Sequence, residues 1–296
     1  MSEDTKRTKR TRDDRANWAK SVDRLQVGSV PAGGINLNVQ GKQLSSPLRG
    51  FGQMWQKSYR VALTGQDVEP TRLISEWKAR FPSFWPKGNN FYGKMGSITP
   101  GDVAVLNLSG PAKSSISTGI MVIYADDESF SFMTPQGHIF AGMITFSSFE
   151  DDGATVAQIQ ALIRASDPVF EIAARLGVVH KQEDIFWHGT LANLARHFGV
   201  TNPNVTQKDT LVDPRVQWGE AKNVWHNSAI RTGMHLPVRI LRNLFGRRKR
   251  ERRFRRNYIS AQIFIRAHPS FLRHPRSIFK SVFMPDWAQP AIKTGR

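Results

Sequence analysis

Apolar positions recur at two different spacings in the middle of the chain, and the spacing predicts where strands and helices lie. Alternation with a period of two predicts strands over 54–63, 103–109, 118–124, 129–134, 138–149 and 155–165. Helical spacing predicts helices over 71–81, 167–177 and 182–198. The last five strands follow one another through short turns, and such connections require antiparallel neighbours. The pattern therefore predicts an antiparallel meander flanked by helices.

The last predicted helix has one apolar side. Its apolar stripe consists of Ile185, Trp187, Leu191, Leu194, Ala195 and Phe198. The polar positions that we place outside this stripe are Lys181, Glu183, Asn193 and Arg196. Because the stripe must be buried and the sheet offers the largest apolar surface, the sequence predicts an α+β domain with a curved sheet wrapped around its long C-terminal helix.

The two ends of the chain differ from this middle part. Residues 1–48 are charged and then rich in Gly, Asn, Gln and Ser, which is typical of a disordered extension. Residues 201–230 contain turn formers and two tryptophans and are interpreted as a linker. The predicted organisation is an extension (1–48), a folded domain (49–200), a linker (201–230) and a basic C-terminal region (231–296).

Two segments and the order of elements resemble a known family. The segments are TPQGHIFAGMITF, over 134–146, and FWHGTLANLARHFG, over 186–199. The order of elements is similar to the helix-grip fold of the SRPBCC (START-like, Bet v 1-like) superfamily, and the first segment is similar to the Gly-His turn of an uncharacterised branch. The resemblance covers about residues 51–199. It implies a cavity between sheet and helix that holds an apolar small molecule, in a superfamily of lipid carriers, aromatic cyclases and hydrolase-like activators.

Alternation along the strands suggests which side chains would line such a cavity. In the strand over 118–124, Thr118, Ile120, Val122 and Tyr124 share one face. The candidate ligand-binding residues are Tyr124, Phe132, His138, Phe140, Gln160 and Trp187. Each has a simpler alternative: the aromatic residues fill the core, His138 stabilises its turn, and Gln160 faces solvent.

Composition excludes several classes of function. The chain has no cysteine, which excludes disulfides, cysteine-based zinc sites and a cysteine nucleophile. We find no HExxH, Gly-x-Ser-x-Gly or phosphate-binding glycine motif, and only Asp184 and His188 have a helical spacing that pairs a carboxylate with an imidazole. We therefore predict a non-enzymatic protein without a cofactor or metal. The alternative of a cyclase or hydrolase in the same cavity rests on the resemblance, with His138 as acid or base.

Positive charge is concentrated at the C-terminus. The chain carries a net charge of +18, and residues 231–296 hold 17 basic against 2 acidic side chains. A basic amphipathic segment over 234–246 precedes the polybasic run RRKRERRFRR, which is typical of binding to an anionic membrane surface. The candidate membrane- or polyanion-binding residues are Arg239, Arg242, Arg247, Arg248, Lys249, Arg250, Arg252, Arg253, Arg255 and Arg256.

The sequence leaves several functional hypotheses open. The first is a cytoplasmic, peripheral membrane protein that binds a hydrophobic small molecule or lipid. The second is an interaction module whose basic tail binds nucleic acid without sequence specificity, and a solvated or protein-binding tail is a further alternative. The sequence lacks a secretory signal and any long apolar stretch, from which we expect a cytoplasmic location, and it leaves the oligomeric state open.

Overall fold

The computed structural model describes residues 14–28, 30, 33–94, 98–110 and 115–235. The chain divides into two units, residues 1–235 and 236–296. All ten predicted membrane- or polyanion-binding residues belong to the second unit and lie outside the described residues. Within the described ranges, no helix combines the length and the apolar character that a membrane span requires.

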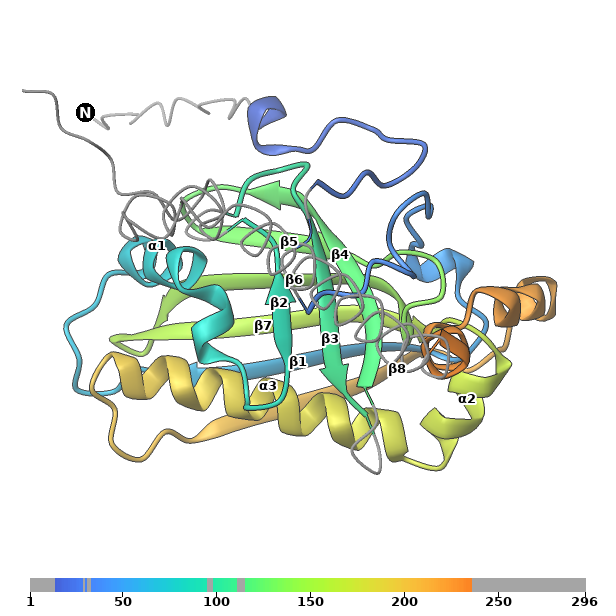
Figure 1. Ribbon diagram of the computed structural model, residues 1–296. Coiled ribbons are helices and arrows are strands. Elements are labelled where there is room, and N and C mark those ends of the chain that lie inside the picture. Colours follow the sequence, from blue (N-terminus) through green and yellow to red (C-terminus); the bar gives the residue numbers. More distant parts are fainter. Residues whose placement is uncertain (1–13, 29, 31–32, 95–97, 111–114, 236–296) are drawn as a thin grey trace, which may run out of the picture. The chain divides into compact units, whose positions relative to one another are not determined.

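The first unit is built on one antiparallel sheet of eight strands (Figure 1). The strands lie in the order β2-β3-β4-β5-β6-β7-β1-β8, and every neighbouring pair is antiparallel. Their bounds are β1 Met54–Ala62, β2 Asn90–Tyr92, β3 Val103–Ser109, β4 Ser115–Ala125, β5 Ser129–Met133, β6 Phe140–Asp151, β7 Ala154–Ala165 and β8 Val205–Asp213. The predicted meander is confirmed as β3 to β7, and β1 joins it by pairing with β7.

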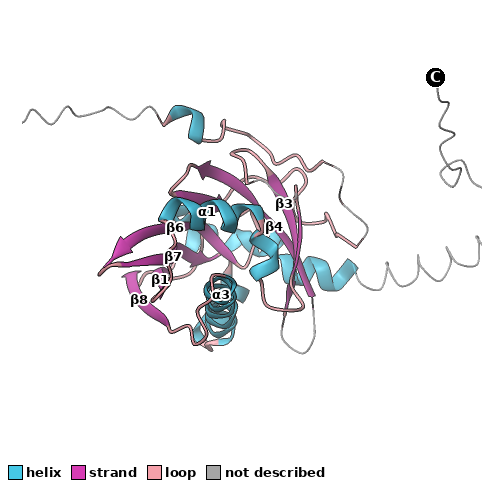
Figure 2. Ribbon diagram, turned by 90° about the vertical axis from the view of Figure 1, so that its left-hand side faces the viewer, coloured by secondary structure: helices cyan, strands magenta, loops and turns pink. Residues whose placement is uncertain are grey.

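Three helices accompany the sheet. They are α1 (Pro70–Ala79), α2 (Pro168–Arg175) and α3 (Val178–His197). Figure 2 shows α3 nearly end-on, with the sheet curving around it and α1 above it. Gly177 has a φ of 74° and separates α2 from α3, since this left-handed conformation favours glycine. The structure thus has the α+β helix-grip architecture that the sequence predicts.

The stripe that α3 turns towards the sheet differs from the prediction. Leu191, Leu194 and Ala195 are fully buried, but Ile185 is 60% exposed, whereas the Glu183 side chain is only 9% exposed. Glu183 is four residues before Trp187 and eight before Leu191, so the helical period places it on the buried side. The N-terminal half of α3 therefore presents charge, not Ile185, to the sheet.

Residues 201–230, where we expected a linker, are part of the folded unit. β8 extends the sheet by pairing with β1, and a 3-10 helix, η5 (Trp218–His226), follows it. Asn223 of η5 donates from Nδ2 to the carbonyl of Ser166, and Ser228 N donates to the carbonyl of Gly137. A helix then runs from Ser228 to His235, where the described residues end.

The N-terminal segment also packs on the sheet, in contrast to the expected disorder of residues 1–48. Leu25 and Val39 are buried against Val105 and Met121, on the face of β3 and β4 that points away from α3. Asn38 is buried and donates from Nδ2 to the carbonyl of Ser117, 2.8 Å away. The described part of this segment therefore covers one face of the sheet.

Candidate functional site

The face of the sheet that points to α3 carries two kinds of side chain. One row runs across neighbouring strands in register and consists of Val122, Phe132, Ile144, Ala161, Lys57 and Asp209. The row is apolar over β4 to β7 and charged over β1 and β8. The concave face thus has an apolar part and a polar part, both facing α3.

Aromatic rings fill the apolar part beneath α1. Trp77, Phe81, Phe130, Phe132 and Phe146 are each at most 3% exposed. Neighbouring rings among them have centroids 4.6–5.9 Å apart, mostly edge to face. Such contacts are typical of a packed aromatic core.

Near the N-terminal half of α3, the helix does not fully cover the apolar side chains of the concave face. Ile144 lies in the middle of the concave face yet is only partly buried. Trp187 of α3 is also partly buried, and its ring lies 5.6 Å from that of Phe146, so it faces β6. Phe140 is 7% exposed and packs with Ala161 and Ile163 beside them. These side chains form an apolar surface that α3 leaves partly accessible.

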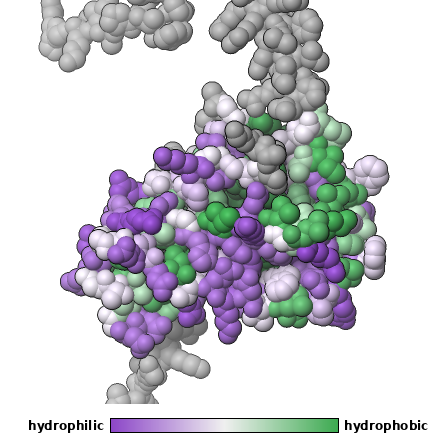
Figure 3. Space-filling model, turned by 90° about the horizontal axis from the view of Figure 1, so that it is seen from below, coloured by the Kyte–Doolittle hydropathy of each residue, from purple (hydrophilic) through white to green (hydrophobic). Residues whose placement is uncertain are grey.

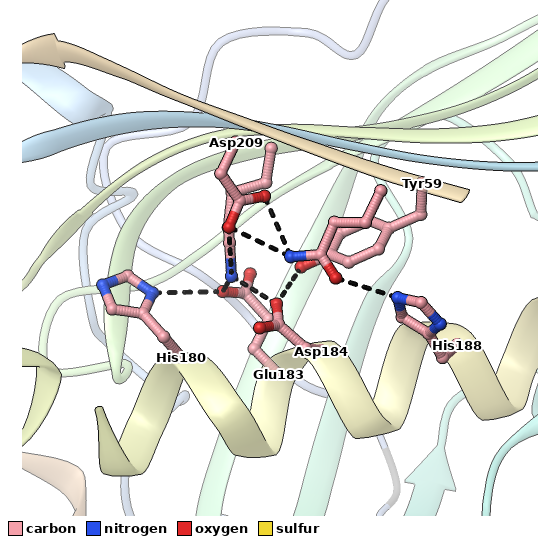
Figure 4. A network of polar contacts seen from close by, with 8 residues as sticks. Tyr59, His180, Glu183, Asp184, His188 and Asp209 are labelled. Carbon is pink, nitrogen blue, oxygen red and sulfur yellow. Dashed lines mark hydrogen bonds and ion pairs between the residues drawn. The ribbon is translucent and has the colours of Figure 1, made fainter. Parts of the chain in front are cut away.

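Beside this surface, a polar network joins α3 to β1 and β8 (Figure 4), and its central cation is Lys57. Lys57 is 1% exposed, and its ammonium contacts Asp184 closely, Glu183 at 3.3 Å and Asp209 at 3.8 Å. The Tyr59 hydroxyl donates to Oδ1 of Asp184, 2.6 Å away. Three carboxylates thus surround one buried ammonium, and buried charges are tolerated when they are paired in this way.

The network fixes the protonation states of its central groups. Burial by itself lowers the pKa of Lys57, but Glu183, Asp184 and Asp209 outweigh burial, so the pKa is raised. Burial raises the pKa of Tyr59, and the same carboxylates raise it further. Burial by itself raises the pKa of Asp184, but hydrogen bonds from Lys57 and Tyr59 outweigh it, so the pKa is lowered. At neutral pH, Lys57 is charged, Tyr59 keeps its proton and Asp184 is ionised.

Two histidines lie at the margins of this network. The helical spacing suggested that His188 pairs with Asp184, but its Nε2 instead lies 2.8 Å from Oε1 of Gln207. Nε2 of Gln207 in turn donates to Asp209. Nδ1 of His180 lies 3.7 Å from Glu183, and the His180 ring stacks on Phe140. The hydrogen bonds of Lys57 and Tyr59 end on carboxylates, so the network's clearest role is to hold α3 against β1 and β8.

The six predicted ligand-binding residues do not form one group. Phe132, Phe140 and Trp187 lie on the concave side, as described above. Tyr124 lies on the opposite face, because a β-bulge between Val122 and Tyr124 reverses the alternation, and its ring packs against Trp18. Gln160 is exposed on the outer face of β7. Tyr124 and Gln160 therefore leave the set of interior candidates.

His138 lies in the turn before β6. The hydrogen bond that its Nδ1 accepts from the N–H of Phe140 measures 3.1 Å. Burial lowers the pKa of His138 to about 4 and outweighs the opposite effect of the Phe140 carbonyl, which lies 3.1 Å from Nδ1 and would accept from a protonated ring. The imidazole is therefore neutral at pH 7. This geometry agrees with the turn-stabilising alternative.

Sequence reasoning missed Lys57 and Glu183, although both carried a signal. Lys57 alternates in phase with Tyr59 and Val61, which points it to the same buried face. Among the residues that the structure describes, no group of three or more His, Asp or Glu side chains could hold a metal ion.

A separate cavity of about 460 Å³ opens at the C-terminal end of α3 and is lined by polar and apolar side chains. The lining residues are Gln66, Asp67, Val68, Arg72, Glu76, His197, Phe198 and Gly199. None of the six predicted ligand-binding residues belongs to it.

Comparison with known proteins identifies similar solved structures only. No family model matches the chain, and no curated protein matches it. A protein of Mycobacterium smegmatis is 14% identical over 50% of this chain and 92% of its own, with a TM-score of 0.35. The di-domain ARO/CYC StfQ from the steffimycin biosynthetic pathway is 11% identical over 49% of this chain and 50% of its own, with a TM-score of 0.39. Major latex-like protein 151 of Panax ginseng is 16% identical over 50% and 99%, with a TM-score of 0.32.

Proposed function

We propose that this protein binds a hydrophobic small molecule or lipid on the concave side of its sheet and docks on anionic membranes through its basic C-terminal region. The observation that carries the first part is the incomplete cover of Ile144. An apolar side chain in the middle of a concave face is normally buried by the helix packed on it. A bound apolar molecule would cover Ile144 and Trp187. Each Å² of apolar surface that is thereby removed from water would contribute about 25 cal/mol to the free energy of binding.

The surroundings of this surface support a ligand with an apolar body and a polar end. Phe132 and Ala161 flank Ile144 in register, and Lys57 continues the same row with its carboxylate partners. Binding sites for small molecules commonly combine an apolar lining with a few fixed polar groups. The polar network would thus lie at one end of the ligand.

A substitution at Ile144 tests this part of the proposal. Ile144→Phe adds bulk where the surface is incompletely covered, so we expect the variant to remain folded and to bind the fluorescent probe anilinonaphthalene sulfonate several-fold more weakly. Ile185→Phe is the matched control, because Ile185 is 60% exposed on the far side of α3. Equal probe affinity of both variants and the unsubstituted protein would contradict binding at Ile144.

The membrane part rests on the charge of residues 231–296, with 17 basic and 2 acidic side chains. Each Lys or Arg near an anionic surface contributes about 1 kcal/mol. Replacing Arg247, Arg248, Lys249 and Arg250 together by Gln should weaken binding to vesicles with 30% phosphatidylserine by at least tenfold. Unchanged binding would contradict membrane docking by this region, and retention of duplex DNA in a salt-dependent manner would favour the nucleic-acid alternative.

A further inference from the structure

Large apolar side chains are exposed together at one end of the first unit. They lie on α2 and at its C-cap, on η5 and on a short 3-10 helix, η2 (Pro47–Arg49). Their exposed fractions are 71% for Leu48, 43% for Val169, 61% for Ile172, 74% for Leu176, 75% for Trp218 and 79% for Trp225. We call these six residues the α2 surface. In Figure 3, apolar residues gather at the right-hand end, where α2 lies in Figure 1.

Hydrogen bonds hold the three elements of the α2 surface together. Nδ2 of Asn223, in η5, donates to the carbonyl of Arg49 in η2 and to that of Ser166 beside α2, at 2.8 and 3.1 Å. Asn227 donates from Nδ2 to Asp167, the N-cap of α2, at 2.9 Å. The ring of Trp218 contacts that of Phe51, 5.4 Å away. The α2 surface is therefore a fixed feature of the fold that exposes two tryptophans.

The exposed charges around the α2 surface are mainly positive. Arg49 and Lys222 are exposed, and the side chains of Arg175 and Arg215 are 55% and 85% exposed. Two of the nearby carboxylates are engaged, since Glu171 is buried and bonded to Arg175, and Asp213 is bonded to Arg164 and Arg215. Another, Glu220 of η5, is half-buried, so exposed cations outnumber exposed carboxylates. An apolar surface with a cationic margin is complementary to a bilayer with anionic headgroups.

The position of the basic region in the chain agrees with this partner. Asn227 is bonded to the N-cap of α2, and the described helix ends at His235, eight residues later. The basic region continues the chain directly from that point. Tryptophan is enriched at membrane interfaces because its ring is apolar and its N–H is polar.

We propose that the α2 surface is a membrane-docking surface that inserts Trp218, Trp225 and the apolar side chains of α2 into the interface of an anionic bilayer. The inference rests on the proposed membrane docking and extends it from the basic region to the folded unit. The basic region supplies attraction over a distance, and the α2 surface supplies apolar insertion, so two signals act together as stable peripheral binding requires.

The test compares two triple variants of the full chain in their binding to vesicles with 30% phosphatidylserine. Ile172→Gln, Leu176→Gln and Trp225→Gln together should lower the partition coefficient by at least about tenfold, which corresponds to about 1.4 kcal/mol. The matched control combines Trp18→Gln, Val22→Gln and Ile185→Gln, whose side chains are 53%, 41% and 60% exposed away from the α2 surface. The control should bind like the unsubstituted protein.

A spectroscopic label makes the test independent of affinity. The chain has no cysteine, so Leu176→Cys and Ile185→Cys each carry a single environment-sensitive dye. On vesicles, the dye at position 176 should shift to shorter wavelength and the dye at 185 should not. A shift at 176 that grows with protein concentration without vesicles would identify a second copy as the partner and overturn the inference.

The outcomes separate this inference from the proposed function. If the α2 triple variant keeps full binding and the Gln variant of residues 247–250 loses it, the α2 surface is not the docking surface, while docking by the basic region stands. If the unsubstituted protein does not bind the vesicles, both fail, and ligand binding at Ile144 is unaffected.

Discussion

Lys57→Met is the substitution that most directly probes the buried polar network. Methionine has a similar length and an apolar end, so the main change is loss of the ammonium. Glu183, Asp184 and Asp209 then face one another without their shared cation. Burial of an uncompensated charge is strongly unfavourable, so we expect a large loss of stability.

The structure sets the size of this loss. Removing one partner of a buried ion pair costs about 3–5 kcal/mol. Asp184 and Asp209 are 29% and 35% exposed and can be rehydrated, whereas Glu183 is 9% exposed and cannot. Because only one of the three carboxylates stays buried without a partner, the lower end of the range of about 3–5 kcal/mol applies. We therefore expect the free energy of unfolding to fall by about 3 kcal/mol at pH 7.

The loss of stability caused by Lys57→Met should be smaller at low pH than at pH 7. In the unsubstituted protein the pKa of Asp184 is lowered, so its stabilising contribution is lost as the pH falls through that value. In the variant, Lys57 no longer counteracts the burial that raises the pKa of Asp184. Protonation of Asp184 then removes a partly buried negative charge and so stabilises the folded state. The stability difference should therefore narrow as the pH falls from 7 towards about 4.

Urea denaturation, followed by tryptophan fluorescence at several pH values, measures this difference. Lys208→Met is the matched control, because Lys208 is exposed on β8, and it should change the free energy of unfolding by less than about 0.5 kcal/mol. If Lys57→Met costs no more than Lys208→Met, the reasoning about the buried network is refuted.

Three further substitutions test single contacts. Tyr59→Phe removes the hydrogen bond to Asp184 and should cost about 1.5–3 kcal/mol of unfolding free energy, whereas no loss on denaturation would contradict a role for this hydroxyl. Gly137→Ala places a Cβ 1.9 Å from the carbonyl oxygen of His226, whereas Gly153→Ala, also at positive φ, meets nothing within 4 Å. Gly137→Ala should therefore lower the melting temperature clearly more than Gly153→Ala, and equal shifts would argue against the turn packing on η5. The folded-state pKa of His138 is lowered to about 4, so its protonation should destabilise the protein as the pH falls from about 6.5 to 4. His138→Gln should reduce this slope, and an unchanged slope would contradict the burial of His138.

The sequence predicts the strands β3 to β7 and the three helices because alternation and helical spacing are strong there. It does not predict β8, since every residue of this edge strand from Thr206 to Val212 is exposed and no apolar alternation marks it. The packing of the described residues between 14 and 48 depends on Leu25 and Val39, with Ala19, Val27 and Leu44 beside them, and these apolar residues follow no regular spacing in a largely polar segment. Tyr124 is misplaced because a bulge cannot be read from the alternation that it interrupts.

The charged residues show a different limit. Helical period and alternation place Glu183 and Lys57 on buried faces, but the general preference of charged side chains for solvent argued for the opposite. Only their mutual pairing, between segments 126 residues apart in the chain, makes that burial favourable. Pairing of this kind is a tertiary property.

Native mass spectrometry of the full-length protein purified from cells, combined with organic extraction, is the decisive test of ligand binding on the concave face. We expect a bound lipid or apolar compound that is released on unfolding and is depleted in Ile144→Phe but retained in Ile185→Phe. A ligand-free mass in all three proteins, even after incubation with a total lipid extract from the same cells, would contradict ligand binding on the concave face.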